Sequence, residues 1–466
     1  MRSAAAPGRR LRAVAGLALG LGLAGCTLVP KYERPPAPVP DRYPTPSATN
    51  AAPSPSGASL SWRAVFADDR LACLIDIALT NNLDLRVAAL NVELTRAQYR
   101  VSRSALLPTV DAGAGYTAAG NFESTRQAWK ASLGTAAYEV DLFGRVRSLN
   151  QRALQQYFAT EQARRGVQLS LVAEVADQYF RWRQAEEQLA LARRTLASVE
   201  ESFTLNRATF EAGATSELDL RTAEGQVQTA RINVVTYERR IEQIRHGLAL
   251  LLGQPLPDAL PAPRPFDDPA VVADVPPGLP SELVQRRPDI LEAEHVLQAA
   301  NASIGAARAA FFPTITLTGE IGTTSSQLAQ LFGSGTGVWS FAPQITVPVF
   351  TGGRNRADLD AARLSARIEV ARYQRAIQIA FREVADALVE VSSYAVEMQA
   401  QAVLIATQRK RFELANARYR EGEDSYLNVL TAQEDLYAAE QNYLQTRLLK
   451  LASQVALYKA LGGGWP

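Results

Sequence analysis

The sequence predicts a mainly α-helical fold with a small membrane-embedded β portion, built from two tandem copies of one structural unit. Three observations predict this fold. Similar motifs recur about 209 residues apart, very long helical stretches dominate each copy, and two short runs of alternating apolar and polar residues interrupt each copy. The length of 466 residues allows two or three domains.

The composition excludes several classes of protein. The chain has 49 basic and 47 acidic residues, and four of the basic ones lie in the first 25 residues, where there is no acid. A nucleic-acid binder usually shows a strong basic excess, which this chain lacks. A hydrophobic content of 47% excludes wholesale disorder. Two cysteines and two histidines exclude a disulfide framework and leave little material for a metal site.

The N-terminus predicts an export signal and a lipid anchor. Residues 1–25 combine a basic start with a short apolar run, which is too short to span a bilayer and is typical of a signal peptide. The run ends in LAGC, which resembles a bacterial lipoprotein box, so Cys26 is expected to be acylated, for example with palmitate, and to become the mature N-terminus. Thr27 follows in place of an aspartate, which favours the outer membrane over the inner membrane. The alternative is a short anchor with an incidental cysteine. No cofactor is expected beyond this covalent lipid.

The mature chain divides at proline-rich segments. Residues 26–60 are predicted to form the lipidated N-terminus and an extended tether rich in Pro, Ala and Ser. The first repeat is expected to cover residues 61–253 and the second 281–462. The linker at 254–280 contains nine prolines, and residues 463–466 form a C-terminal tail.

Each repeat is predicted to follow the same order of elements. A helical stretch ends at a proline, two barrel strands follow, and a very long helical stretch closes the repeat. The expected ranges are 67–106, 107–143 and 144–251 in the first copy, and 281–311, 312–350 and 357–460 in the second. Coiled-coil spacing recurs within the last of these stretches, at Ile377, Phe381, Val384, Leu388 and Val391.

A glycine interrupts each long helical stretch about two thirds of the way along. Gly213 and Gly422 stand at these places. Because glycine accepts the left-handed backbone conformation without steric cost, each stretch is predicted to form two antiparallel helices joined by a turn.

The strand runs carry a membrane signal. Apolar residues alternate with polar ones, as expected for a strand with lipid on one face and water on the other. A half-buried strand of a soluble protein is the alternative, and the lipoprotein box favours the membrane. The residues predicted to face lipid are Trp129, Ile315, Leu317, Trp339, Phe341 and Ile345.

Four strands cannot close a membrane barrel alone, because their edge N–H and C=O groups would face hydrocarbon. Two chains would give an eight-stranded barrel, and side chains fill the interior of a barrel of that size. Three chains would give twelve strands and leave a conduit. A function as a pore therefore favours a trimer. After the signal peptide, no uninterrupted apolar run reaches 18 residues, which excludes a polytopic helical transporter.

Several motifs resemble one family over nearly all of residues 26–462. They are RRPDILEAEHVLQAANASIGAARAAFFPTITLTG (286–319), YEVDLFGRVR (138–147), PVFTGGRNRADLDAA (348–362) and RYREGEDSYLNVLTAQEDLY (418–437). The chain resembles the TolC-type outer-membrane efflux factors in their lipoprotein branch, which is OprM- or NodT-like.

The resemblance implies a homotrimer that shares a twelve-stranded outer-membrane β-barrel, continued by a long α-helical barrel in the periplasm. It implies the exit duct of a tripartite efflux pump, which passively conducts small toxic compounds or drugs. The implied partners are a periplasmic membrane-fusion adaptor and an inner-membrane pump, commonly a proton-driven one. A role in multidrug resistance follows from the same likeness.

The resemblance also implies two groups of site residues. The periplasmic tip turns, where the adaptor docks, correspond to Gly213, Ala214, Ser216, Gly422, Glu423 and Ser425. The pore constriction corresponds to Leu218, Asp219, Leu427, Asn428 and Thr431. Many relatives carry aspartate where this chain has Asn428 or Thr431, which puts a strongly acidic constriction in doubt. The alternative for both glycines is a simple role in forming the turn.

No motif predicts an enzyme. The sequence has no P-loop, metal-ligand spacing or nucleophile motif, and His246 and His295 lie in separate helical stretches. Cys73 is expected to be a small buried hydrophobe. The alternative function is a periplasmic adaptor-like coiled-coil lipoprotein, which would not need a repeated pair of amphipathic strands. A lipoprotein enzyme is a third class.

Overall fold

Helices dominate the computed structural model, which describes residues 27–43, 60–268, 272–273, 275–276 and 280–463. The predicted signal peptide and Cys26 lie outside the described residues. The chain forms two compact units. One contains the chain up to Pro36, Asn91–Glu161 and Glu292–Gln374, and the other contains Ala37–Leu90, Gln162–Leu291 and the chain from Arg375 onward.

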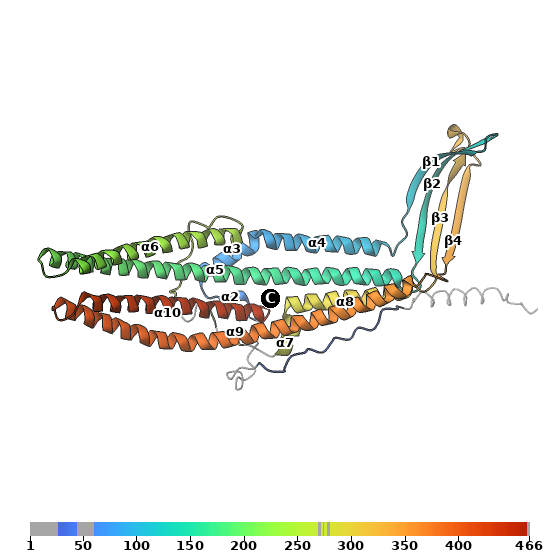
Figure 1. Ribbon diagram of the computed structural model, residues 1–466. Helices are drawn as coiled ribbons and strands as arrows, with labels where there is room; N and C mark the ends of the chain where they lie inside the picture. The colour runs from blue at the N-terminus through green and yellow to red at the C-terminus, as the bar shows by residue number, and fades with distance from the viewer. Residues whose placement is uncertain (1–26, 44–59, 269–271, 274, 277–279, 464–466) are drawn as a thin grey trace, which may run out of the picture. The chain divides into compact units, whose positions relative to one another are not determined.

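The helices follow the predicted order in both copies (Figure 1). In the first copy they are α2 (Trp62–Val65), α3 (Asp69–Asn81), α4 (Leu83–Ser104), α5 (Arg145–Glu211) and α6 (Glu217–Leu252). In the second they are α7 (Pro280–Arg286), α8 (Pro288–Ala309), the short 3-10 helix η3 (Leu328–Gln330), α9 (Arg354–Arg420) and α10 (Tyr426–Ala460). Among the described residues, no helix is both long enough and apolar enough to cross a membrane.

Two helices predicted as single stretches are divided. The stretch at 67–106 breaks at Asn82, whose side-chain oxygen accepts a hydrogen bond from the Leu85 N–H at 2.8 Å and so begins a new helix. The stretch at 281–311 breaks at Arg287, because Pro288 disfavours the α conformation in the residue before it. A side-chain cap in one case and a proline in the other therefore override a helical pattern that continues across both positions.

The long helices form two hairpins of nearly equal size, as a duplicated unit requires. α5 and α9 have 67 residues each, and α6 and α10 have 36 and 35. Ion pairs join the two arms of each hairpin, such as Arg193 to Glu238 at 2.8 Å and Arg409 to Glu440 at 2.7 Å.

The predicted coiled-coil residues on α9 lie on a packing face. Ile377 and Val384 are fully buried, and Phe381, Leu388 and Val391 are partly buried. Phe381 also stacks on Tyr43, with ring centroids 5.2 Å apart. The spacing in the sequence therefore identified the buried stripe of this helix.

The strands form a four-stranded antiparallel sheet in the order β1-β2-β3-β4. They are β1 (Asp111–Gly120), β2 (Thr125–Val140), β3 (Thr314–Ser325) and β4 (Gly337–Thr346), and Figure 1 shows them side by side. A bulge in β2 between Thr135 and Tyr138 contains Ala137, which has a positive φ of 54°. The sheet joins one strand pair from each copy.

The register of the sheet brings the six residues predicted to face lipid onto one face. Residues directly opposite one another in an antiparallel pair share a face, and the faces alternate along each strand. Trp129 lies opposite Ser325, Trp339 opposite Ile321, and Ile345 opposite Ile315. Leu317 and Phe341 follow on the same face by alternation.

The first part of the predicted tether is held by specific contacts. Arg34 makes two hydrogen bonds to the Glu294 carboxylate, both 2.8 Å, and the Tyr32 hydroxyl donates to the same group at 3.0 Å. The side chains of Asn301 and Arg308 donate to backbone carbonyls of Pro30 and Leu28. Residues 28–34 therefore lie along α8, where these polar contacts hold them.

Cys73 departs from its prediction, because it is only partly buried in α3. Among the described residues, no group of three or more His, Cys, Asp and Glu side chains is arranged to hold a metal ion.

Candidate functional site

The two helical hairpins end in turns of the same construction. Gly213 and Gly422 both have φ of 75°, the left-handed conformation that favours glycine. In each turn the glycine N–H donates to the carbonyl three residues before it, and the next N–H donates to the carbonyl five residues before it. This is the Schellman arrangement, which satisfies the last carbonyls of the long helix.

The first residues after each turn begin the return helix in different ways. In the first copy, the Ser216 hydroxyl accepts from the Asp219 N–H at 3.2 Å, and the Asp219 carboxylate accepts from the Ser216 N–H at 3.4 Å. These two bonds form a capping box. In the second copy, Ser425 takes the same place but its side chain makes no capping bond.

Asp424 organises the second turn. Its carboxylate accepts hydrogen bonds from the Ser425 N–H at 2.8 Å and from the Asn428 amide at 2.5 Å. Arg418 lies 3.4 Å away on the other carboxylate oxygen. The hydrogen bond from Asn428 is the main cause that lowers the pKa of Asp424 below its usual range. The Asp424 carboxylate therefore lies beside Asn428, which is one of the residues predicted for the constriction.

The residues predicted for the constriction lie at the start of each return helix. Leu218 and Leu427 occupy equivalent places and are 75% and 64% exposed. The Thr431 hydroxyl donates to the Leu427 carbonyl at 2.9 Å, and Asn428 lies three residues before Thr431. Spacing of three and four residues places Leu427, Asn428 and Thr431 on one side of α10.

Contacts between the two hairpins meet just behind the turns. The Tyr419 hydroxyl donates to the side chain of buried Asn206 at 2.9 Å. Tyr426 packs on Ala223 and Val429, and its ring lies 5.5 Å from that of Tyr419. Burial raises the pKa of Tyr426 to about 12, and it also raises that of Tyr419. Both hydroxyls therefore stay protonated near neutral pH.

Sequence reasoning missed these tyrosines and Asn206. The signal is a difference between the copies: Tyr419 and Tyr426 flank the second turn, where the first copy has Phe210 and Glu217. Because the first copy has no tyrosine at either place, it has no hydroxyl for a contact like the one from Tyr419 to Asn206.

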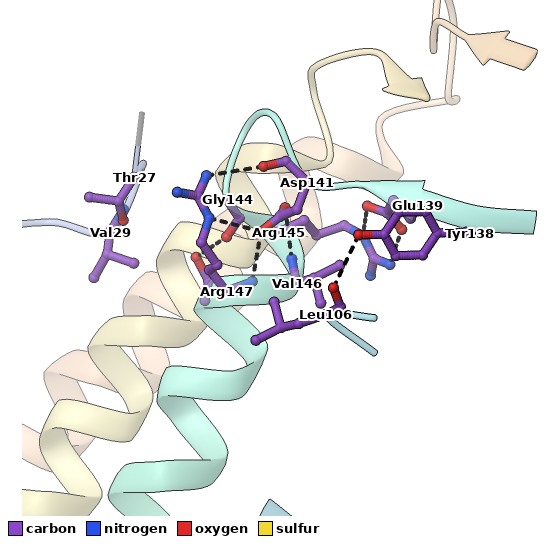
Figure 2. A network of polar contacts seen from close by, with 11 residues as sticks. Thr27, Val29, Leu106, Tyr138, Glu139, Asp141, Gly144, Arg145, Val146 and Arg147 are labelled. Carbon is purple, nitrogen blue, oxygen red and sulfur yellow. Dashed lines mark hydrogen bonds and ion pairs between the residues drawn. The ribbon is translucent and has the colours of Figure 1, made fainter. Parts of the chain in front are cut away.

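The passage from β2 to α5 holds a second network, drawn in Figure 2. The Asp141 carboxylate accepts from the N–H groups of Val146 and Arg147 at 3.0 and 2.9 Å, and from the Arg147 side chain at 3.0 Å. Glu139 binds Arg145 through both oxygens, and Gly144 has φ of 75°. An acidic cap on the first turn of α5 thus fixes the point where strand becomes helix.

An open groove of about 1010 Å³ runs along α9 toward the second turn. Its wall includes Val403, Leu414, Arg418, Asp424 and Asn428. Val403 is 68% exposed and Leu414 is 54% exposed. Apolar side chains at this level of exposure make the groove a candidate for contact with another chain.

The outer membrane efflux protein family model matches the chain twice, over residues 74–254 and 279–463. The toluene efflux pump outer membrane protein TtgF of Pseudomonas putida is 45% identical over 471 residues, covering 96% of each chain. The outer membrane protein OprJ of Pseudomonas aeruginosa is 43% identical over 465 residues, covering 97% of this chain and 96% of OprJ.

A solved structure agrees with these matches. The open state of the MtrE outer membrane channel of Neisseria gonorrhoeae superposes with a TM-score of 0.88 at 42% identity, covering 94% of this chain and 98% of MtrE. The predicted family, the mainly helical duplicated fold with four strands per chain and the channel function are confirmed, and the adaptor-like alternative is set aside. The chain belongs to the outer membrane efflux protein family, a family of channels and not of enzymes, and is the outer-membrane channel component of an efflux pump.

Proposed function

We propose that three copies of this chain form a passive exit duct, with a shared twelve-stranded barrel in the outer membrane and a helical barrel in the periplasm. Each copy supplies four strands, with β1 and β4 at the two edges of its sheet. Pairing of β1 of one copy with β4 of the next satisfies the edge N–H and C=O groups that hydrocarbon cannot. Twelve strands leave an interior wide enough for a conduit.

The observation that carries this proposal is an exposed heptad stripe on α9. Val389, Val396 and Val403 recur at seven-residue intervals and are 54%, 68% and 68% exposed. Such a stripe is one half of a coiled-coil seam and requires a second helix. Ile232 and Val235 on α6 are 65% and 59% exposed and offer that partner surface on a neighbouring copy.

The tip turns are the proposed docking points for a periplasmic membrane-fusion adaptor, which joins the duct to an inner-membrane pump. Gly213, Ala214, Ser216, Gly422, Glu423 and Ser425 are exposed. The exposure of backbone and short polar side chains in both turns supports contact with another protein. The free energy for export then comes from the pump, commonly a proton-driven one, because the duct has no catalytic part to play.

The gate is proposed to lie just behind the turns. In a trimer, each of Leu218, Asp219, Leu427, Asn428 and Thr431 recurs three times around the axis. Apolar contact near Leu427 and hydrogen bonding near Asn428 would hold the resting pore shut. Small shifts of α9 and α10 would then change the aperture strongly.

The membrane attachment is proposed to have two parts. The face that carries Trp129, Ile315, Leu317, Trp339, Phe341 and Ile345 would contact lipid, and acyl chains on Cys26 would insert beside it. The name of the toluene pump relative supports organic solvents, together with drugs, as the exported class.

The mass of the native, detergent-extracted protein tests the assembly. Extraction from outer membranes is expected to give three times the mass of one lipidated chain. A monomer that stays in solution after removal of the lipid would overturn the shared barrel. Labelling cells with a palmitate analogue tests the anchor, with Cys26→Ser as the control that should lose the label.

Crosslinking tests the docking of the adaptor. A photoreactive residue in place of Glu423 is expected to capture the adaptor in cells that express the whole pump. The same residue in place of Arg245, an exposed position on α6 far along the chain from the turn, serves as the control. Equal capture at both positions would contradict docking at the tips.

A further inference from the structure

The charged residues of the four strands all lie on one face of the sheet. They are Asp111, Arg126, Lys130, Glu139 and Glu320. Asp111 and Glu320 both lie opposite Gly134, Lys130 lies opposite Thr324, and Glu139 opposite Thr316. Arg126 shares this face because it lies four residues before Lys130 on β2. This face is therefore opposite to the one that carries Trp129 and Phe341.

Two of these charges meet in the middle of the sheet. The Lys130 ammonium lies 2.5 Å from the Glu320 carboxylate, and their side chains are 44% and 34% exposed. Ser132 and Ser340 also hydrogen-bond to Glu320, and Ser340 lies directly opposite it on β4. Glu320 is the seventh residue of the twelve-residue strand β3, so the pair lies near the middle of the strand.

Of the other charges of this face, Glu139 and Arg126 lie away from the middle, and Asp111 does not. Glu139 pairs with Arg145 where β2 passes into α5. Asp111 begins β1 and lies level with Glu320, because both lie opposite Gly134, whereas Arg126 is the second residue of β2. Half-way along the sheet, the polar face thus presents the oppositely charged pair and one further carboxylate, that of Asp111.

We propose that the Lys130–Glu320 pair sets the charge selectivity of the conduit inside the barrel. This inference rests on the proposed trimer, in which the polar face lines an aqueous interior and three such pairs form a ring. Rings of unpaired carboxylates make a pore selective for cations. Pairing of Glu320 with Lys130 lowers the negative charge at this level, which Asp111 shares, so that the conduit prefers cationic solutes less than it would with two unpaired carboxylates.

Thiol modification in intact cells tests the inference without involving the periplasmic gate. Ala342→Cys places a reporter on the polar face, one alternation step from Ser340, in a Cys73→Ala background. Cells are treated with a cationic trimethylammonium-ethyl or an anionic sulfonato-ethyl methanethiosulfonate, and the two rates of modification are compared. Phe341→Cys, the neighbouring residue on the apolar face, is the matched control.

The expected result depends on the partner of Glu320. With the pair intact, the ratio of cationic to anionic rates gives the starting value, to which the Asp111 carboxylate contributes. Lys130→Met is expected to raise this ratio roughly fivefold, because one bared carboxylate attracts one reagent and repels the other. Lys130→Met combined with Glu320→Gln should return the ratio to the starting value.

The outcomes separate this inference from the proposed barrel. Equal rates at Ala342→Cys and Phe341→Cys would show that the two faces do not divide water from lipid, and the barrel itself would fall. Rapid modification at Ala342→Cys alone, with a ratio that Lys130→Met leaves unchanged, would keep the barrel and overturn the role of the pair.

Discussion

Asp219 and Asn428 occupy equivalent places in the two repeats, yet they make different contacts. Asp219 completes a capping box with Ser216, while the Asn428 amide donates to Asp424. Both residues therefore help to form a helix start, apart from any part in the proposed constriction. Leu218 and Leu427 have no such local task, because their side chains are largely exposed. The leucines are the cleaner places to test the gate.

Leu427→Gly is predicted to make cells leaky to large antibiotics, because it removes an apolar contact that a trimer repeats three times. Leu250→Gly, at a 79% exposed leucine of α6, carries the same helix penalty of about 1 kcal/mol and is the control. Sensitivity to a bulky antibiotic, at matched protein level, is the measurement. Unchanged sensitivity in Leu427→Gly would count against a gate at this residue.

His295 is predicted to make stability depend on pH. Its Nδ1–H donates to the side-chain amide oxygen of Gln155 at 2.7 Å, and burial lowers the pKa of the imidazole below 6.5. The folded state therefore binds the proton less tightly than the unfolded state does. The stability that neutral His295 contributes is complete above pH 6.5 and is lost as the pH falls through the lower pKa of the folded state.

Thermal unfolding of the detergent-extracted protein at neutral pH and near pH 5 checks this prediction. His295→Gln keeps a hydrogen-bonding side chain. Its unfolding temperature is expected to fall less between neutral pH and pH 5 than that of the native protein. The same drop in both proteins would mean that other groups govern the acid response.

At the scale of the helix, the two turns predict an unequal response to the same substitution. Ser216→Ala removes both the acceptor and the reciprocal geometry of a capping box, which costs about 1 kcal/mol. Ser425→Ala removes no capping bond of its own side chain and should cost much less. Hydrogen exchange in the first turn of α6 and of α10 measures the two effects. Equal loss of protection in both variants would contradict this account.

The N-terminal segment shows how a single glycine allows two elements to pack. A Cβ on Gly305 of α8 would come within 2.5 Å of the Val29 side chain and 2.8 Å of the Ser148 hydroxyl. The absence of a side chain at this position therefore lets residues 28–34 lie against α8. A proline-rich composition predicts an extended segment, and it says nothing about the surface that holds it.

At the scale of the assembly, Val396→Glu is predicted to shift the protein from trimer to monomer. The substitution places a charge in the proposed coiled-coil seam, where burial without a partner costs several kcal/mol. Ala190→Glu, at an exposed position of α5, adds the same charge elsewhere and should leave the trimer intact. Native mass after detergent extraction is the measurement, with at least about a tenfold loss of trimer expected for Val396→Glu. An unchanged mass would place the seam elsewhere.

The sequence by itself determined the duplication, the positions of both glycine turns, the buried stripe of α9 and the alternation of the strands. Each of these depends on residues close together in the chain, through helix or strand periodicity and local backbone preference. The family motifs added the channel function, because they recur in the right order across both repeats.

Only the tertiary structure decided which distant residues meet. Tyr419 and Asn206 are 213 positions apart, and Lys130 and Glu320 are 190 apart. Such pairs depend on the register between segments from different repeats, which no local pattern encodes. The hold of residues 28–34 on α8 belongs to the same class, as do the contacts that join the two hairpins behind their turns. Local rules therefore specify the elements, and packing between the repeats specifies the polar contacts at the proposed gate and in the proposed conduit.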